Sequence, residues 1–267
     1  MELQGRVATL KRQGLGLVAV SYDSPATLTD FAGRRGITFP MLSDTGSAVI
    51  TRYHLLNRQV PEVTPQFGIP YPGTFVLDAH GIVTARYFEE AYQERTTVES
   101  ILTHLGGGAG SVHATRASTN HLSLVASASD GVVAPGTHFS LTVDVTPKRK
   151  MHVYAPGATD YRPIALAIDP QPGLVLRQAQ YPKPEILYFQ PLDEHVPVYE
   201  KPFRIVQDVT LDASREGQEL FKNRTSITIS GKVNYQACDD KICFIPATVP
   251  VSWTIAVRQL DTERAKK

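Results

Sequence analysis

The sequence contains little cysteine and no excess of either charge. Its 267 residues include two cysteines, Cys238 and Cys243, too few for a disulfide-stapled scaffold or a four-cysteine zinc or iron–sulfur site. Lysine and arginine total 27 against 26 for aspartate and glutamate, so the formal net charge is +1. Because such a chain has no long-range field to attract nucleic acid or an anionic membrane, we expect no nucleic-acid partner.

Long apolar runs are also missing. The most apolar short run, Leu17 to Val20, is far below the roughly 20 residues that span a bilayer. The first six residues, Met1 to Arg6, contain no apolar core of the kind a secretory signal needs. We therefore expect neither membrane insertion by this chain nor a signal peptide within it.

A glycine-rich segment divides the chain. Four of the five residues 106–110 are glycine, which holds neither helix nor strand, so we predict a linker over 106–118. The length suits two domains of ordinary size, which we place at 1–105 and 119–260.

The segments before and after this linker differ in the periodicity of their apolar residues. Upstream, helical and strand-like stretches alternate, which predicts an α/β sheet covered by helices. Expected helices cover 2–12, 24–31, 47–53 and 97–105, and expected strands 15–21, 74–78 and 81–87. Downstream, short alternating stretches separated by proline and glycine turns predict an antiparallel β-sandwich with almost no helix. Its expected strands are 121–126, 139–145, 164–168, 203–209, 226–235 and 248–257.

The upstream segment Gly68–Gly81 resembles the second half of a thioredoxin-fold redoxin. A proline shortly before the strand Thr-Phe-Val-Leu-Asp, and a turn ending in glycine, resemble the alkyl hydroperoxide reductase and thiol-specific antioxidant group. Val18–Ser24 and Phe39–Asp44 fit the same group. Pro72 matches a position that is a cis-proline in many thioredoxin-like proteins, and a cis bond before proline costs only about 0.5–1 kcal/mol.

This resemblance has one departure. The active cysteine of a redoxin follows its first core strand, whereas no cysteine here precedes Cys238, so we expect no peroxidase activity. We interpret this half as an N-terminally truncated, incomplete thioredoxin-like domain without that strand, and a degenerate domain is the alternative. Strands 15–21 and 74–78 would then either pair directly or leave a gap, and the half should be weakly stable.

The cysteine pair allows several interpretations. Four residues separate Cys238 from Cys243, so the sulfurs can meet if the loop folds back. A structural disulfide closing so small a ring contributes about 2 kcal/mol in the loop-entropy model. Metal binding needs more than two thiolates, and the eight histidines show no zinc spacing. A redox-active pair is the favoured interpretation, with a structural disulfide or inert buried thiols as alternatives.

The segment Asn234-Tyr235-Gln236-Ala237-Cys238 through Cys243 resembles the N-terminal periplasmic domain of the thiol:disulfide interchange protein DsbD. That family has an immunoglobulin-like sandwich with a Tyr-Gln-small-Cys…Cys signature. Further matching segments extend the resemblance over about residues 119–258: Met151–Gly157, Tyr181–Pro184 and Pro197–Glu200.

The resemblance implies roles for individual residues. Cys243 would form the mixed disulfide with a partner, and Cys238 would resolve it. Residues 188–195, which we call the cap segment, would cover the cysteines. Within and around the site, the resemblance and the motif single out Phe189 and Leu192 as shields, Asp193 and Glu194 as charges, and His152, Tyr154, Tyr235 and Gln236 as neighbours. Asp239 and Asp240 would either disfavour the thiolate or form the turn.

The sequence therefore predicts thiol–disulfide exchange without a cofactor. The partner would be a thioredoxin-like protein or a membrane thiol–disulfide exchange protein, and the compartment periplasmic or otherwise extracytoplasmic by family likeness. Two alternatives remain. One is a non-enzymatic partner-binding sandwich with a structural disulfide, and the other is a fragment of a peroxiredoxin-like enzyme whose active cysteine lies upstream.

Overall fold

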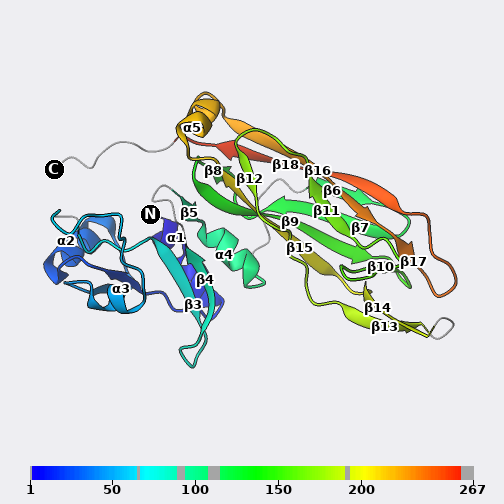
Figure 1. The fold of residues 1–267 in the computed structure, drawn as a ribbon, viewed down its shortest axis with the longest axis horizontal. Helices are drawn as coiled ribbons and strands as arrows, with labels where there is room; N and C mark the ends of the chain where they lie inside the picture. Colours follow the sequence, from blue (N-terminus) through cyan, green and yellow to red (C-terminus); the bar gives the residue numbers. More distant parts are fainter. Residues whose placement is uncertain (1, 65–66, 89–93, 108–114, 190–192, 260–267) are drawn as a thin grey trace. The chain divides into compact units, whose positions relative to one another are not determined.

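The chain folds as two compact units, Met1–Val98 and Glu99–Lys267. The computed structural model (Figure 1) describes residues 2–64, 67–88, 94–107, 115–189 and 193–259. In the described part, no helix is both long and apolar enough to cross a bilayer.

The first unit mixes short helices with two small sheets. Its helices are α1 (Glu2–Arg12), α2 (Pro25–Arg35) and α3 (Ala48–Arg52). Its strands are β1 (Ala19–Ser21), β2 (Met41–Ser43), β3 (Gly73–Leu77), β4 (Val83–Phe88) and β5 (Arg95–Thr96). Strands β1 and β2 pair in parallel, and β3 and β4 form the expected antiparallel hairpin.

Helix α2 begins where the sequence predicts. The Ser24 side chain accepts a hydrogen bond from the Thr27 amide (3.2 Å), and Pro25 occupies the first turn, where its missing N–H costs nothing. The helix ends at Gly36, whose φ of 61° lies in the left-handed region that glycine adopts without strain.

The two sheets of the first unit stay separate. Among the described residues β1 does not pair with β3, so of the two outcomes considered from sequence, direct pairing or a gap, direct pairing is not formed. Val20, Leu42 and Leu77 on these strands are 48%, 53% and 51% exposed. The hydrophobic residues buried in this unit, as far as the structure describes it, are Leu10, Leu28, Ile50 and Val98.

Pro72 precedes β3 as expected, but its peptide bond does not match the expected geometry. Described peptide bonds are all trans, including the bond between Tyr71 and Pro72. The likeness to a thioredoxin-type cis-proline therefore holds in sequence and not in backbone conformation.

The second unit is an immunoglobulin-like β-sandwich. One sheet has the order β12-β15-β9-β7-β6 and the other β11-β16-β18-β8 (Figure 1). The strands of the first are β6 (Thr115–Ser118), β7 (Leu122–Ala128), β9 (Thr137–Pro147), β12 (Leu174–Leu176) and β15 (Phe203–Leu211). Those of the second are β8 (Val132–Val133), β11 (Ala165–Ile168), β16 (Ser226–Tyr235) and β18 (Ala247–Val257).

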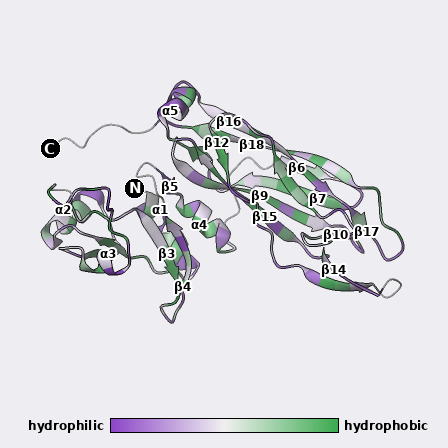
Figure 2. Ribbon diagram, viewed as in Figure 1, coloured by the Kyte–Doolittle hydropathy of each residue, from purple (hydrophilic) through white to green (hydrophobic). Residues whose placement is uncertain are grey.

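Period-two alternation builds the sandwich core. Along β16 and β18 buried and exposed residues alternate, so each strand presents one apolar face, and Figure 2 shows apolar and polar residues side by side along these strands. Ile229, Val233, Val251 and Trp253 lie on that face. The Trp253 indole N–H donates to the Ser127 carbonyl (3.0 Å), which removes the cost of burying it.

A third sheet, with the order β13-β14-β10-β17, extends from the sandwich. Its strands are β10 (His152–Tyr154), β13 (Glu185–Phe189), β14 (Glu194–Tyr199) and β17 (Ala237–Cys238). Of the cap segment, residues 188–189 end β13 and residues 194–195 begin β14, whereas residues 190–192 lie outside the described part of the chain. This sheet holds both the cap segment and the first cysteine.

Several short strands, including β2, β10 and β12, have no counterpart among the expected elements, and three further elements differ in type or in place. Helix α5 (Arg215–Phe221) interrupts the strands, begun by Ser214, whose side chain accepts from the Gly217 amide (3.1 Å). Strand β6 lies within the expected linker 106–118 and pairs with β7. Helix α4 (Val98–His104) belongs to the second unit from Glu99 onward, although the sequence placed it in the first domain.

Two hydrogen bonds explain why α4 stays with the sandwich. Ser100 Oγ lies 2.7 Å from Ser140 Oγ, and His104 Nε2 lies 2.9 Å from Asp208 Oδ1. Burial alone would raise the pKa of Asp208, but the bonds from His104 and Ser140 hold it below its ordinary value. The helix is thereby tied to β9 and β15.

The contrast between the cores predicts a difference in resistance to protease. Among the described residues, most of the buried hydrophobic side chains lie in the second unit and few in the first, so the first unit should open locally at lower cost. Limited proteolysis should leave a resistant fragment that begins no later than Thr115 and contains both cysteines. Survival of a fragment within residues 1–98 after the sandwich is degraded would contradict this expectation.

Candidate functional site

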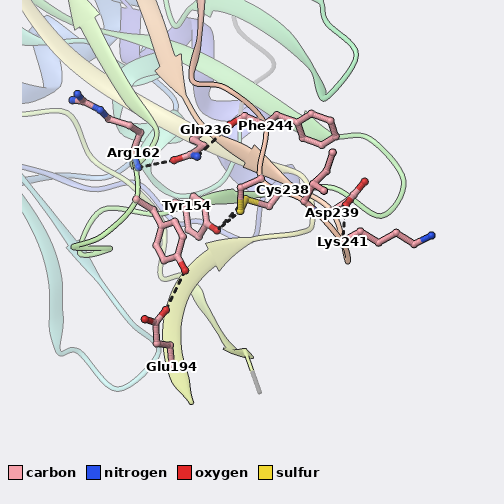
Figure 3. Close-up of a disulfide and its surroundings, with 11 residues drawn as sticks. Tyr154, Arg162, Glu194, Gln236, Cys238, Asp239, Lys241 and Phe244 are labelled. Carbon is pink, nitrogen blue, oxygen red and sulfur yellow. Dashed lines mark hydrogen bonds between the residues drawn. A yellow bond between two sulfur atoms is a disulfide. The ribbon is translucent and has the colours of Figure 1, made fainter. Parts of the chain in front are cut away.

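Cys238 and Cys243 form a disulfide at the edge of the third sheet. Their Cα atoms are 4.1 Å apart, which confirms the predicted proximity. Cys238 ends β17 opposite His152 of β10, and Cys243 follows in the loop to β18. The two cysteine residues differ in access, because Cys238 is 2% exposed whereas Cys243 is exposed. Figure 3 shows the disulfide beside the ring of Tyr154.

The loop between the cysteines is closed by its own hydrogen bonds. The Asp239 amide donates to the Ile242 carbonyl (3.0 Å), and the Phe244 amide donates to the Ala237 carbonyl (2.8 Å). Asp239 Oδ1 accepts from the amides of Ile242 (2.9 Å) and Lys241 (2.8 Å), and these bonds lower the pKa of Asp239. Asp239 therefore serves the turn, one of the two roles considered from sequence.

Tyr154 contacts both sulfurs. Its hydroxyl lies 3.0 Å from Cys238 Sγ and 3.3 Å from Cys243 Sγ, and it must be the donor because disulfide sulfurs carry no hydrogen. Burial, followed by the neighbouring Tyr161 and Glu194, raises the pKa of Tyr154. The hydroxyl therefore remains protonated, and available as a donor, throughout the neutral range.

A small cluster of buried side chains surrounds this contact. It consists of Tyr154, Val196, Val198 and Cys238, and we call it the site cluster. Leu187 from β13 and Tyr161 from the loop after β10 pack against it. The Tyr161 ring stacks on Tyr154, with centroids 4.0 Å apart and planes 11° apart, and its hydroxyl donates to Glu194 Oε2 (3.0 Å).

Gln236 and His152, two other expected neighbours of the cysteines, make different kinds of contact. Gln236 bridges two segments, since its Oε1 accepts from the Arg162 amide (3.1 Å) and its Nε2 donates to the Phe244 carbonyl (3.2 Å). His152 meets Tyr154 edge to face, and burial lowers its pKa against the opposing effect of Glu200 and nearby aspartates.

Tyr235 belongs to the sandwich core instead of the site cluster. Its ring is 1% exposed, and its hydroxyl lies 2.8 Å from Thr119 Oγ1 and 3.3 Å from His121 Nδ1. The strand alternation explains this position, because Tyr235 is on the buried face at the end of β16.

The cap segment can be followed only in part. The side chain of Phe189 and the whole of Leu192 lie outside the described residues, so their expected shielding role stays a prediction. Asp193 has a left-handed φ of 53° and accepts a bond from the exposed Tyr188 hydroxyl (3.0 Å). Glu194 contacts the site through Tyr161, as described above.

Sequence reasoning missed Tyr161 and Leu187. Leu187 alternates along β13 with the exposed Ile186 and Tyr188, so a period-two pattern could have placed it on the covered face of that strand. Tyr161 lies in an irregular loop between β10 and β11, where no periodicity indicates which way a side chain points. Its contacts depend on three segments that are distant in sequence.

Comparisons with known proteins agree with this division of the chain. Residues 122–253 match the family described as thiol:disulfide interchange protein DsbD, N-terminal. Residues 1–86 match the AhpC/TSA family. The two halves of the chain resemble two families of redox proteins. The DsbD-type half is the one that carries the disulfide described here.

Individual relatives cover only parts of the chain. Proteins from two strains of Mycobacterium tuberculosis, each named "Putative peroxiredoxin", are 40% identical over 76 residues, 28% of this chain and 47% of theirs. The chain thus spans about half the length of these curated relatives.

Solved structures of the DsbD type show weaker likeness. The reduced N-terminal domain of Neisseria meningitidis DsbD has 14% identity and a TM-score of 0.30 over 44% of this chain and 81% of that one. The N-terminal periplasmic domain of Proteus mirabilis ScsB has 10% identity and a TM-score of 0.34 over 52% and 49%. At scores this low, the assignment depends on the family matches.

The Tyr154 contact predicts an effect on thiol acidity at this site. Hydrogen bonding to a thiolate favours the charged form, so Tyr154→Phe should raise the pKa of Cys238 in the reduced protein by about one unit. The thiolate ultraviolet absorbance, followed as pH is varied, measures this. Tyr199→Phe is the matched control, because that buried tyrosine of the same sheet donates to the Pro182 carbonyl (2.7 Å). Equal thiol titrations in the two variants would contradict the role given to Tyr154.

Proposed function

We propose that the sandwich carries out thiol–disulfide exchange through Cys238 and Cys243 with a protein partner. The observation that carries this proposal is the unequal exposure of the two sulfurs. Exchange needs a thiolate to approach a disulfide sulfur in line, so access decides which sulfur reacts. Cys243 is exposed and Cys238 is 2% exposed, so the partner reacts at Cys243.

The electron bookkeeping of this step is simple. A partner thiolate attacks Cys243 Sγ, the bond between the two cysteines breaks, and Cys238 leaves as a thiolate. A mixed disulfide then joins the partner to Cys243. A second thiol of the partner attacks the partner's own sulfur in that bond and releases Cys243 as a thiolate, so the pair gains two electrons and the partner loses two. The reverse sequence passes them on.

Tyr154 supports the leaving group. Its hydroxyl lies 3.0 Å from Cys238 Sγ, where negative charge develops as the disulfide opens. A donor placed in advance stabilises that charge without a reorganisation cost. Because burial raises the pKa of Tyr154, its proton stays on the phenol and the hydroxyl acts as a hydrogen-bond donor only.

A purely structural disulfide explains the loop less well. The two backbone hydrogen bonds described above already bring the ends of the loop together. A ring of six residues contributes about 2 kcal/mol in the loop-entropy model, and less where the unlinked loop is held closed. The added stability is small for a bond that leaves one sulfur open to oxidants and thiols.

The surroundings of Cys243 suit a protein partner. Ile242 is 56% exposed and Ile245 is 87% exposed, so exposed apolar side chains that a docking protein would cover lie on either side of Cys243 in the sequence. We infer that this partner is a thioredoxin-like protein or a membrane thiol–disulfide exchange protein. The compartment would be extracytoplasmic, since a disulfide-exchanging domain persists in an oxidising environment. Residues 1–98 contain no cysteine, so the proposal gives them no redox step.

Single-cysteine variants of the full chain test which sulfur reacts. Cys238→Ser should form a mixed disulfide at least about tenfold faster than Cys243→Ser, because access of the thiolate limits the rate. The probes are oxidised glutathione and a thioredoxin-like protein that lacks its second cysteine and carries glutathione on the first, so that each reaction displaces glutathione as a thiolate. Mass spectrometry of quenched samples gives both rates. Equal rates, or faster trapping by the Cys243→Ser protein, would contradict the assignment of Cys243.

A further inference from the structure

Three chain segments meet at Tyr161. The loop between β10 and β11 supplies Tyr161 itself, β10 supplies the ring of Tyr154 on which it stacks, and β14 supplies the carboxylate of Glu194 that it binds. The same loop is attached to the cysteine segment, because the Arg162 amide donates to Gln236 Oε1 (3.1 Å; Figure 3). The loop after β10 is thus fixed to the cysteine segment, and Tyr161 links this loop to the hairpin formed by β13 and β14.

That hairpin covers the buried sulfur. Leu187 of β13 and Val196 and Val198 of β14 lie in or against the site cluster with Cys238. Strand β13 is an edge strand, paired with β14, and β14 in turn pairs with β10. Movement of the described strands of the hairpin away from the cluster would uncover Cys238 and would have to break the bond between Tyr161 and Glu194.

We propose that Tyr161 is a positioning residue that latches the β13–β14 hairpin over Cys238. This role refines the exchange function proposed above and rests on it. The stacked ring fixes the hydroxyl of Tyr161 beside the site, and the bond to the carboxylate of Glu194, the first residue of β14, holds that end of the hairpin against it. Loss of the hydroxyl leaves the stack in place and removes the latch.

The hairpin also supplies a matched comparison. Tyr188 donates to Asp193 Oδ1 at 3.0 Å, the same distance as the bond from Tyr161 to Glu194. Both Tyr188 and Asp193 belong to the hairpin, and Tyr188 is 50% exposed, so their bond does not join the hairpin to the site. Tyr188→Phe therefore removes a tyrosine–carboxylate bond without touching the latch.

The test measures access to Cys238 directly. In full-length protein carrying Cys243→Ser, iodoacetamide alkylates Cys238, and its rate is followed by mass spectrometry as pH is varied. The alkylation rate reaches a plateau at high pH, and this plateau rate reports hairpin opening. The midpoint, the pH at which the rate is half of the plateau, reports the pKa of the thiol. Tyr161→Phe should raise the plateau by about three- to tenfold, the loss expected for one partly exposed bond to a charged group, with the midpoint unchanged.

Two further variants make the result decisive. Glu194→Ala should raise the plateau as much as Tyr161→Phe, and the two together should add nothing, because they remove the same bond. Tyr188→Phe should leave plateau and midpoint at the parent values. The proposal is overturned if Tyr161→Phe alkylates at the parent rate, if a shifted midpoint accounts for the whole change, or if Tyr188→Phe has an equal effect.

This experiment needs no protein partner, so its failure is separate from failure of the exchange function. A latch without exchange would show the plateau effect and no mixed disulfide with a thioredoxin-like protein. Exchange without a latch would show the opposite pattern.

Discussion

The pairing of β17 with β10 is the constraint on which the site depends. Strand β16 ends at Tyr235 in the sandwich, and β17 begins two residues later in another sheet, with Cys238 directly opposite His152. Because of this change of sheet, the side chain of Cys238 packs in the site cluster, whereas Cys243 lies in the exposed loop that follows. Gln236, the one residue between the strands, bonds to both sides of the transition through Arg162 and Phe244.

Electrostatics around the disulfide follow from the same geometry. The polar group nearest the sulfurs is a neutral phenol, whose pKa burial raises, so it offers a proton without adding charge. Two of the nearby carboxylates accept hydrogen bonds elsewhere: Asp239 accepts from two amides of its own turn, and Glu194 accepts from Tyr161. The site thus stabilises a thiolate by a hydrogen bond instead of by a neighbouring cation.

The sequence predicted the regular parts of the fold well. Residues 226–235 alternate and form β16 with those bounds, because each side chain on one face meets the opposite sheet. Helix α5 was missed, since a seven-residue helix gives too little periodicity to detect. Strand β6 was hidden in an expected linker, and its pairing with β7 depends on a distant partner that local composition does not reveal.

The site shows the same limit. Cys238, Cys243 and Tyr154 were predicted from their motif and lie together. Tyr235 was expected beside them, but the alternation of side chains along β16 places it on the buried face, where it packs in the sandwich core. Tyr161 acquires its contacts only when the loop after β10, β14 and the cysteine segment fold together, so no local signal identifies it.

The central claim is that the disulfide is reactive, and its reduction potential tests that claim most directly. The full-length protein can be equilibrated in glutathione or dithiothreitol redox buffers, with the oxidised fraction measured after acid quenching and thiol labelling. The account predicts a potential in the range of exchange proteins, from about −270 to −120 mV. A potential below about −300 mV, typical of structural disulfides, would contradict it.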